Sequence, residues 1–125
     1  LEPLLGYLTL AEKMHNDNSG ICEAFNFGPN LDSNKSVKEL INESLKTWPG
    51  EWTDCSNNEN NLHEARLLNL TIEKAANKLG WYPYWNFKET VFRTINWYKK
   101  FHSESVSAKS CCLNDINDFT KRYTC

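Results

Sequence analysis

The fold is decided by residues 71–101, TIEKAANKLGWYPYWNFKETVFRTINWYKKF, which specify two helices and the corner that joins them. Apolar residues recur three and four positions apart in the first half, which is typical of an amphipathic helix; they are Ile72, Ala75, Ala76 and Leu79. Thr71 can cap the start of this helix, and Gly80 suits the left-handed position after its end. Because Pro83 cannot continue a helix, the chain must turn there.

A second, longer helix is predicted to begin after Asn86. Asn86 and Glu89 stand three residues apart, as the partners of a capping box do. The apolar residues that follow at helical spacing are Phe87, Val91, Ile95 and Tyr98, with Phe92 and Phe101 beside them. This helix therefore needs a broad partner surface. Trp81 and Trp85 are expected to pack beneath the corner, and core packing is the first interpretation of every aromatic residue here.

Two further helices are predicted on the N-terminal side. The first is expected to end near His15, and its apolar stripe consists of Leu4, Leu8, Ala11 and Met14, with Leu5 and Tyr7 beside it. The second begins at a capping box formed by Ser36 and Glu39 and ends at Pro49-Gly50. Its apolar residues are Val37, Leu40, Ile41, Leu45 and Trp48.

Short strands are predicted between these helices. Residues 21–27 are rich in apolar and aromatic side chains and stop at Gly28-Pro29-Asn30, and residues 51–55 are a second candidate. Residues 62–70 are predicted to be extended or an irregular strand. We therefore expect a small α/β domain of about four helices and short strands over residues 1–102. Residues 103–125 are expected to form a linker and a short docking tail.

Composition limits the classes of function. A chain of 125 residues can form one domain with its own core. Its 14 basic and 16 acidic residues are interspersed, so we expect no nucleic-acid partner. No apolar run is long enough to span a bilayer and no signal peptide is evident, so we expect no membrane partner and a cytoplasmic location.

The five cysteines lack the spacing of a structural zinc site; they are Cys22, Cys55, Cys111, Cys112 and Cys125. Free thiols in a reducing compartment are the simplest explanation. An extracellular location is the alternative, and it would make glycosylation acceptors of Asn34, Asn42 and Asn69.

Sequence motifs of the common catalytic sites are absent. The chain has no Gly-rich dinucleotide fingerprint, no triphosphate loop, no HExxH and no GxSxG. The spacing of His15, His63 and His102 predicts no pairing with a carboxylate. We therefore predict no catalytic residue, no cofactor site and no metal site in this chain.

Several segments, in order, resemble the C-terminal, substrate-binding part of the CDP-glucose 4,6-dehydratase family of extended short-chain dehydrogenase/reductases. They are LEPL, GYL and AEK within residues 1–13, NFGP at 26–29, HEA at 63–65 with leucines at 68 and 70, LGW at 79–81 with Pro83, and WY at 97–98. The tail around Cys112 and Tyr123 also resembles the end of this family. Thr71 departs from the pattern, because the family has Asp there, and so do Asn114 and Asp115.

The resemblance implies a parent enzyme, an NAD-dependent lyase that converts CDP-glucose to CDP-4-keto-6-deoxyglucose and water. It also implies a homodimer and an N-terminal Rossmann domain. In this family the Gly-rich loop and the catalytic Tyr-x-x-x-Lys pair precede the equivalent of Leu1, so the chain lacks them. We therefore expect the chain alone to bind a CDP-sugar and to be inactive.

The resemblance also implies substrate contacts. Asn30 matches a loop position that approaches the nucleotide, although a residue there also suits a turn. His63 matches a histidine near the diphosphate, and Glu64 and Arg66 follow it; Arg66 fits either a phosphate contact or a surface ion pair. The alternative function is a non-enzymatic module of the same fold that binds a nucleotide-sugar or a protein.

Overall fold

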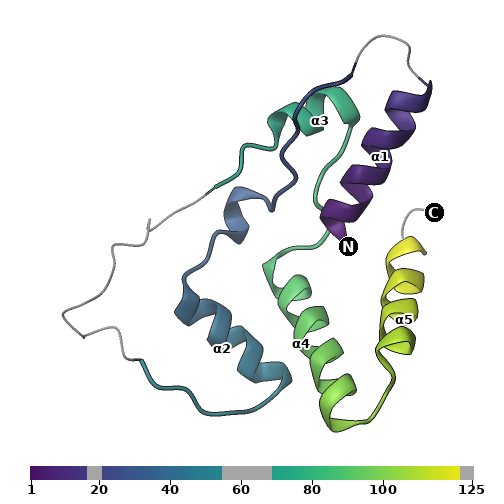
Figure 1. Ribbon diagram of the computed structural model, residues 1–125. Helices are drawn as coiled ribbons and strands as arrows, with labels where there is room; N and C mark the ends of the chain where they lie inside the picture. Colours follow the sequence, from purple (N-terminus) through teal and green to yellow (C-terminus); the bar gives the residue numbers. More distant parts are fainter. Residues whose placement is uncertain (17–20, 55–68, 122–125) are drawn as a thin grey trace.

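The computed structural model describes residues 1–16, 21–54 and 69–121, and these residues form helices joined by irregular segments (Figure 1). The helices are α1 (Glu2–Asn16), α2 (Val37–Thr47), α3 (Glu73–Leu79), α4 (Phe87–Ser103) and α5 (Ala108–Thr120), with a short 3-10 helix η1 (Leu31–Ser33). Helix α1 packs against α3, and α4 contacts both α2 and α5. The described helices are too short or too polar to cross a membrane.

The predicted α/β class is wrong for the described part of the chain, because no strand is found there. Residues 21–30 are largely extended, and Ile21, Phe25 and Phe27 do pack inward against Ala75, Leu79 and Trp81, as a strand with one buried face would. A strand also needs a hydrogen-bonded neighbour, and these residues have none among the described ones. Residues 51–54 likewise form no strand, and residues 55–68 lie outside the described residues.

The predicted helix ends are mostly confirmed. The hydroxyl of Ser36 accepts a hydrogen bond from the backbone N–H of Glu39, whose carboxylate accepts one from the Ser36 N–H. The side-chain oxygen of Asn86 likewise accepts a hydrogen bond from the backbone N–H of Glu89 and so caps α4. Gly80 ends α3 in the left-handed conformation with a φ of 69°. The predicted Thr71 cap is wrong: Ile72 precedes α3 and provides no side-chain cap.

The C-terminal region is more helical than predicted. Helix α4 runs to Ser103 and α5 begins at Ala108, so the linker is only a few residues long. In place of a short docking tail, α5 is a full helix that packs against α4. Phe119 is buried at its far end, with its ring edge-on to Trp85 at 4.9 Å between centroids. Val91 of α4 is buried as predicted, whereas Ile95 is only partly buried.

One aromatic seam joins α1, residues 21–30 and the corner after α3. The ring of Phe27 lies edge-on to Trp81 at 5.0 Å between centroids and to Tyr7 at 5.5 Å. Trp81 is 3% exposed, and Gly6 is buried beneath the Phe27 ring. A β-carbon at Gly6 would lie only 2.4 Å from Cδ1 of Phe27. Because Gly6 has no side chain, the backbone of α1 can lie directly against the ring of Phe27.

An ion-pair cluster ties the same extended segment to α3. The carboxylate of Glu23 pairs with Lys74 at 2.6 Å and with Lys78 at 2.5 Å. Lys74 also donates to the carbonyl of Ala24 at 3.0 Å. The hydrogen bonds from Lys74 and then Lys78 lower the pKa of Glu23 from 4.5 to about 2.

We predict that Gly6→Ala destabilises the protein. Ala favours a helix interior by up to about 1 kcal/mol over Gly. The clash with Phe27 should outweigh this gain, because overpacking costs about 1–3 kcal/mol. Urea denaturation measures the difference. Gly50→Ala is the matched control, since its β-carbon would meet only Leu45 at 3.6 Å. Equal stability of the two variants would contradict the close packing of Phe27 on Gly6.

We predict that Glu23→Gln lowers stability at neutral pH and not at pH 2. The pKa of Glu23 is lower in the folded protein, so its stabilising contribution is fully present above about pH 4.5 and is lost as the pH falls to about 2. Denaturation of both proteins across this range should show the difference shrink. Glu12→Gln is the matched control, because it removes an exposed carboxylate of α1 that is not part of the lysine cluster. A constant difference for Glu23→Gln would exclude the lysine cluster as its cause.

Candidate functional site

A groove of about 420 Å³ lies between the turn after Phe27 and the start of α3. It is lined by Pro29, Asn30, Leu31, Asn69, Leu70, Thr71, Ile72 and Glu73. Asn30 is exposed, and its φ of −64° and ψ of 157° belong to ordinary extended backbone. Its side chain does not cap η1. A turn conformation therefore does not require Asn at this position, and the residue lines the groove.

The other three predicted contacts, His63, Glu64 and Arg66, lie outside the described residues. Asn69 follows this segment closely in the sequence and lines the same groove as Asn30. The structure therefore brings Asn30 together with the residues that follow the HEAR segment, although some forty positions separate them in the sequence. Asn69 and Thr71 were not identified as site residues from the sequence; Thr71 was interpreted as a helix cap.

A second, mostly apolar cavity of about 280 Å³ adjoins this groove and shares Pro29 and Leu70 with it. Its other lining residues are Glu2, Pro3, Phe27, Gly28, Trp81, Pro83, Trp85 and Thr90. Three buried polar atoms of these residues have no hydrogen-bond partner among the described residues: Glu2 Oε2, Trp81 Nε1 and Trp85 Nε1. Buried polar groups are rarely left unsatisfied. The Trp81 N–H donor and the Glu2 carboxylate acceptor suit a hydroxyl group, which both accepts and donates.

Glu2 is held in this cavity by the corner after α3. Its Oε1 accepts hydrogen bonds from the backbone N–H groups of Tyr84, at 2.9 Å, and Trp85, at 2.7 Å. These contacts link the start of α1 to residues more than 80 positions away. The sequence carried no signal for this role, because Glu2 resembles an ordinary acidic residue in the first turn of a helix.

The outer face of α1 is apolar and uncovered. Leu4, Tyr7, Leu8 and Met14 are exposed, and Leu8 is 68% exposed. Leu5 and Leu10 instead pack toward the core. The predicted apolar stripe therefore exists, but most of it faces away from the rest of the described structure.

The described histidines lie away from the groove. Neither His15 nor His102 lines the groove or the adjoining cavity. His102 lies instead against Trp48 and Tyr98, with its ring roughly parallel to theirs. In residues 1–16, 21–54 and 69–121, no three His, Cys, Asp or Glu side chains are placed to hold a metal ion. Of the cysteines, Cys22, Cys111 and Cys112 are free, and Cys55 and Cys125 lie outside the described residues.

The chain is 31% identical over 124 residues to CDP-glucose 4,6-dehydratase of Salmonella typhimurium (strain LT2). The alignment covers 99% of the chain and 34% of the Salmonella protein, so the chain spans about a third of the length of this relative. No family model matches the chain. The similarity supports a relationship to part of a sugar-nucleotide dehydratase.

Proposed function

We propose that this chain is the nucleotide-sugar-binding portion of a CDP-glucose 4,6-dehydratase, the enzyme that converts CDP-glucose to CDP-4-keto-6-deoxyglucose and water. The observation that carries the proposal is the 31% identity along 99% of the chain. The order of the LEPL, NFGP, HEA and LGW segments agrees with it. The chain would form one wall of the substrate cleft, as the C-terminal part of the parent enzyme.

The groove and the adjoining cavity supply a physical basis for this role. Asn30 and Asn69 offer amide groups that can hydrogen-bond to a nucleotide, and His63 and Arg66 would approach the diphosphate. The adjoining cavity combines apolar walls with the unpartnered atoms of Glu2 and Trp81. Such a lining suits a sugar ring, whose C–H faces are apolar and whose hydroxyl groups need partners.

The hydride chemistry would be supplied by NAD bound elsewhere in the parent enzyme. The five glycines of this chain are widely separated, at positions 6, 20, 28, 50 and 80, so none of them forms a dinucleotide-binding turn. We therefore assign no hydride-transfer or proton-transfer step to the residues of this chain. Their proposed work is to bind and orient the CDP-sugar.

The uncovered face of α1 is proposed to pack on the nucleotide-binding half of the parent enzyme. Surfaces between domains of one chain typically measure about 600–1,500 Å². Exposed apolar patches larger than a few hundred Å² are uncommon on monomeric proteins. Leu4, Tyr7 and Leu8 lie together on the first two turns of α1 and would form the centre of such a surface.

We predict that the chain prefers cytidine nucleotides. Calorimetric titration should show tighter binding of CDP and CDP-glucose than of UDP-glucose or ADP. Asn30→Ala should weaken CDP binding about fivefold, because one hydrogen bond contributes about 1 kcal/mol and about 1.4 kcal/mol is a factor of ten. His63→Ala should also weaken it.

The matched control for Asn30→Ala is Asn77→Ala, which changes an exposed amide of α3 outside the groove. It should leave CDP binding unchanged. Equal affinity for all four nucleotides would exclude the dehydratase assignment and favour a non-enzymatic binding module.

We predict that replacing both Leu4 and Leu8 by Asp reduces self-association and the binding of a hydrophobic dye, while the unfolding midpoint is kept. Both side chains are exposed, so the charges remain in water. Sedimentation and dye fluorescence measure the first effect, and urea denaturation the second. Leu5→Asp is the contrasting variant, because Leu5 packs toward the core and a charge there should unfold the protein. A monomeric wild-type chain that binds no dye would argue against this docking face.

A further inference from the structure

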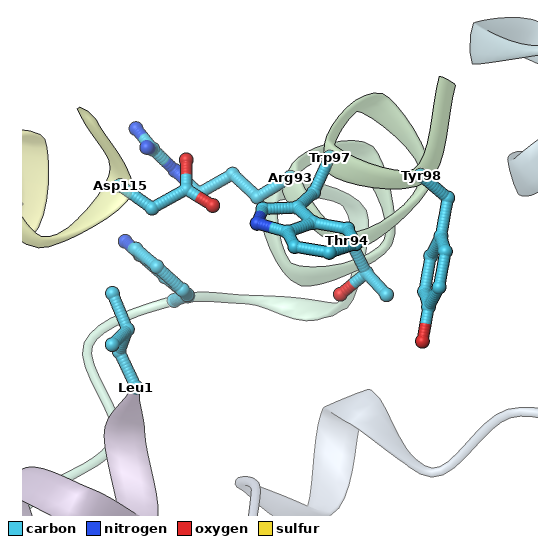
Figure 2. Close-up of a pocket in the computed structure, with 7 residues that line it drawn as sticks. Leu1, Arg93, Thr94, Trp97, Tyr98 and Asp115 are labelled. Carbon is cyan, nitrogen blue, oxygen red and sulfur yellow. The ribbon is translucent and has the colours of Figure 1, made fainter. Parts of the chain in front are cut away.

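A separate pocket of about 260 Å³ lies where the start of α1 meets α4 and α5 (Figure 2). Its lining residues are Leu1, Trp85, Arg93, Thr94, Trp97, Tyr98 and Asp115. None of them lines the groove that contains Asn30, and only Trp85 is shared with the cavity beside that groove. The proposed nucleotide site therefore leaves this pocket unexplained.

Two aromatic walls of the pocket meet nearly at a right angle. Trp97 and Tyr98 follow one another on α4, and their ring planes are 77° apart. Phe101 stacks on Trp97 at 5.5 Å between centroids, so one face of the Trp97 ring is already covered. A flat nucleobase would stack on only one of these walls. A saturated ring carries C–H groups on its faces and its edges, so it can contact both.

Arg93 is held in a fixed position beside these walls. Its side chain is 15% exposed, and its Nε donates to Glu89 at 2.6 Å. Its guanidinium group lies over the ring of Trp85, 4.8 Å from the centroid. A guanidinium has five N–H donors: the one on Nε contacts Glu89, and Nη1 lies 3.8 Å from Oδ2 of Asp118, which leaves further N–H groups for a ligand. Little conformational entropy remains to be lost when a ligand binds Arg93.

Two further polar groups lack strong partners. The indole N–H of Trp85 is buried and has no hydrogen-bond partner among the described residues, and Trp85 is only 9% exposed. The carboxyl group of Asp115 is partly buried, and this burial raises its pKa above the ordinary value, although Arg93 and Lys100 act in the opposite direction. Figure 2 shows Asp115 and Arg93 on the same side of the pocket, near the indole of Trp97, with Leu1 on the opposite side.

We propose that this pocket binds one neutral pyranose ring, which lies on Trp97, donates a hydroxyl proton to Asp115 and accepts hydrogen bonds from Arg93 and Trp85. A hydroxyl group is both donor and acceptor, so a sugar satisfies all three protein groups. Arg93 and Asp115 carry opposite charges, so the pair as a whole favours neither an anion nor a cation. An apolar ring would leave Asp115 and the Trp85 N–H unsatisfied.

The size of the pocket agrees with a single ring. Sites for drug-sized ligands usually measure about 300–1,000 Å³, and this pocket falls below that range. So few ligand atoms give a weak, millimolar dissociation constant.

The test is a titration of the ¹⁵N-labelled 125-residue chain with methyl glucoside and methyl galactoside, followed by the indole N–H signals of its five tryptophans. The signals of Trp85 and Trp97 should shift and saturate in the millimolar range. Those of Trp48 and Trp52, which do not line the pocket, should stay in place. Signals that do not shift, or that shift without saturation, would overturn the proposal.

A pair of matched variants tests the polar contact. Asp115→Ala removes the carboxylate at a position in α5 where Ala favours the helix, so the fold should persist. It should weaken sugar binding about tenfold, the effect of a lost hydrogen bond to a charged group. Asp32→Ala, which changes an exposed carboxylate of η1, should leave binding unchanged. Equal binding by both variants, or cytidine shifting Trp85 and Trp97 more than the sugars do, would also overturn it.

Discussion

The ring of Phe27 lies directly on the backbone of α1 at Gly6, and the N-terminal half of the structure depends on this contact. It is possible because Gly6 has no side chain, and it is reinforced by Trp81, whose ring is edge-on to Phe27. Residues 21–30 have no neighbouring strand among the described residues, so packing replaces the hydrogen bonds that would normally hold an extended segment. The position of Asn30, only three residues further on, follows from this contact.

A second constraint acts at the corner between α3 and α4. Glu2 accepts hydrogen bonds from the backbone of Tyr84 and Trp85, so the start of α1 and the start of α4 are joined. Trp85 therefore contacts several parts of the structure. It lines both the cavity beside the groove and the pocket against α5, and its ring packs against Phe119. The two proposed ligand sites are therefore neighbours, and they share one buried aromatic residue.

The described part of the chain has a small apolar core and a large exposed apolar surface. Among the described residues, the buried apolar side chains are few, and many large apolar side chains remain exposed on α1 and α4. A helix that leaves an apolar face uncovered usually meets another surface in its working state. In the proposed dehydratase, that surface would belong to the nucleotide-binding half, where the redox chemistry would take place. This chain would contribute binding energy and orientation in place of reacting groups.

The sequence by itself determined most of the helices and their ends, although not the start of α3 or the full length of α5. Periodicity, the capping pair Ser36 and Glu39, and Gly80 act over three or four residues, so their effects can be predicted without knowing the fold. Motif order also predicts Asn30 as a nucleotide contact. Only the tertiary structure decided which face of α1 is buried, that residues 21–30 form no sheet, and that Trp85, Arg93 and Asp115 line one pocket. These outcomes depend on contacts between residues far apart in the sequence, and local patterns carry no information about such contacts.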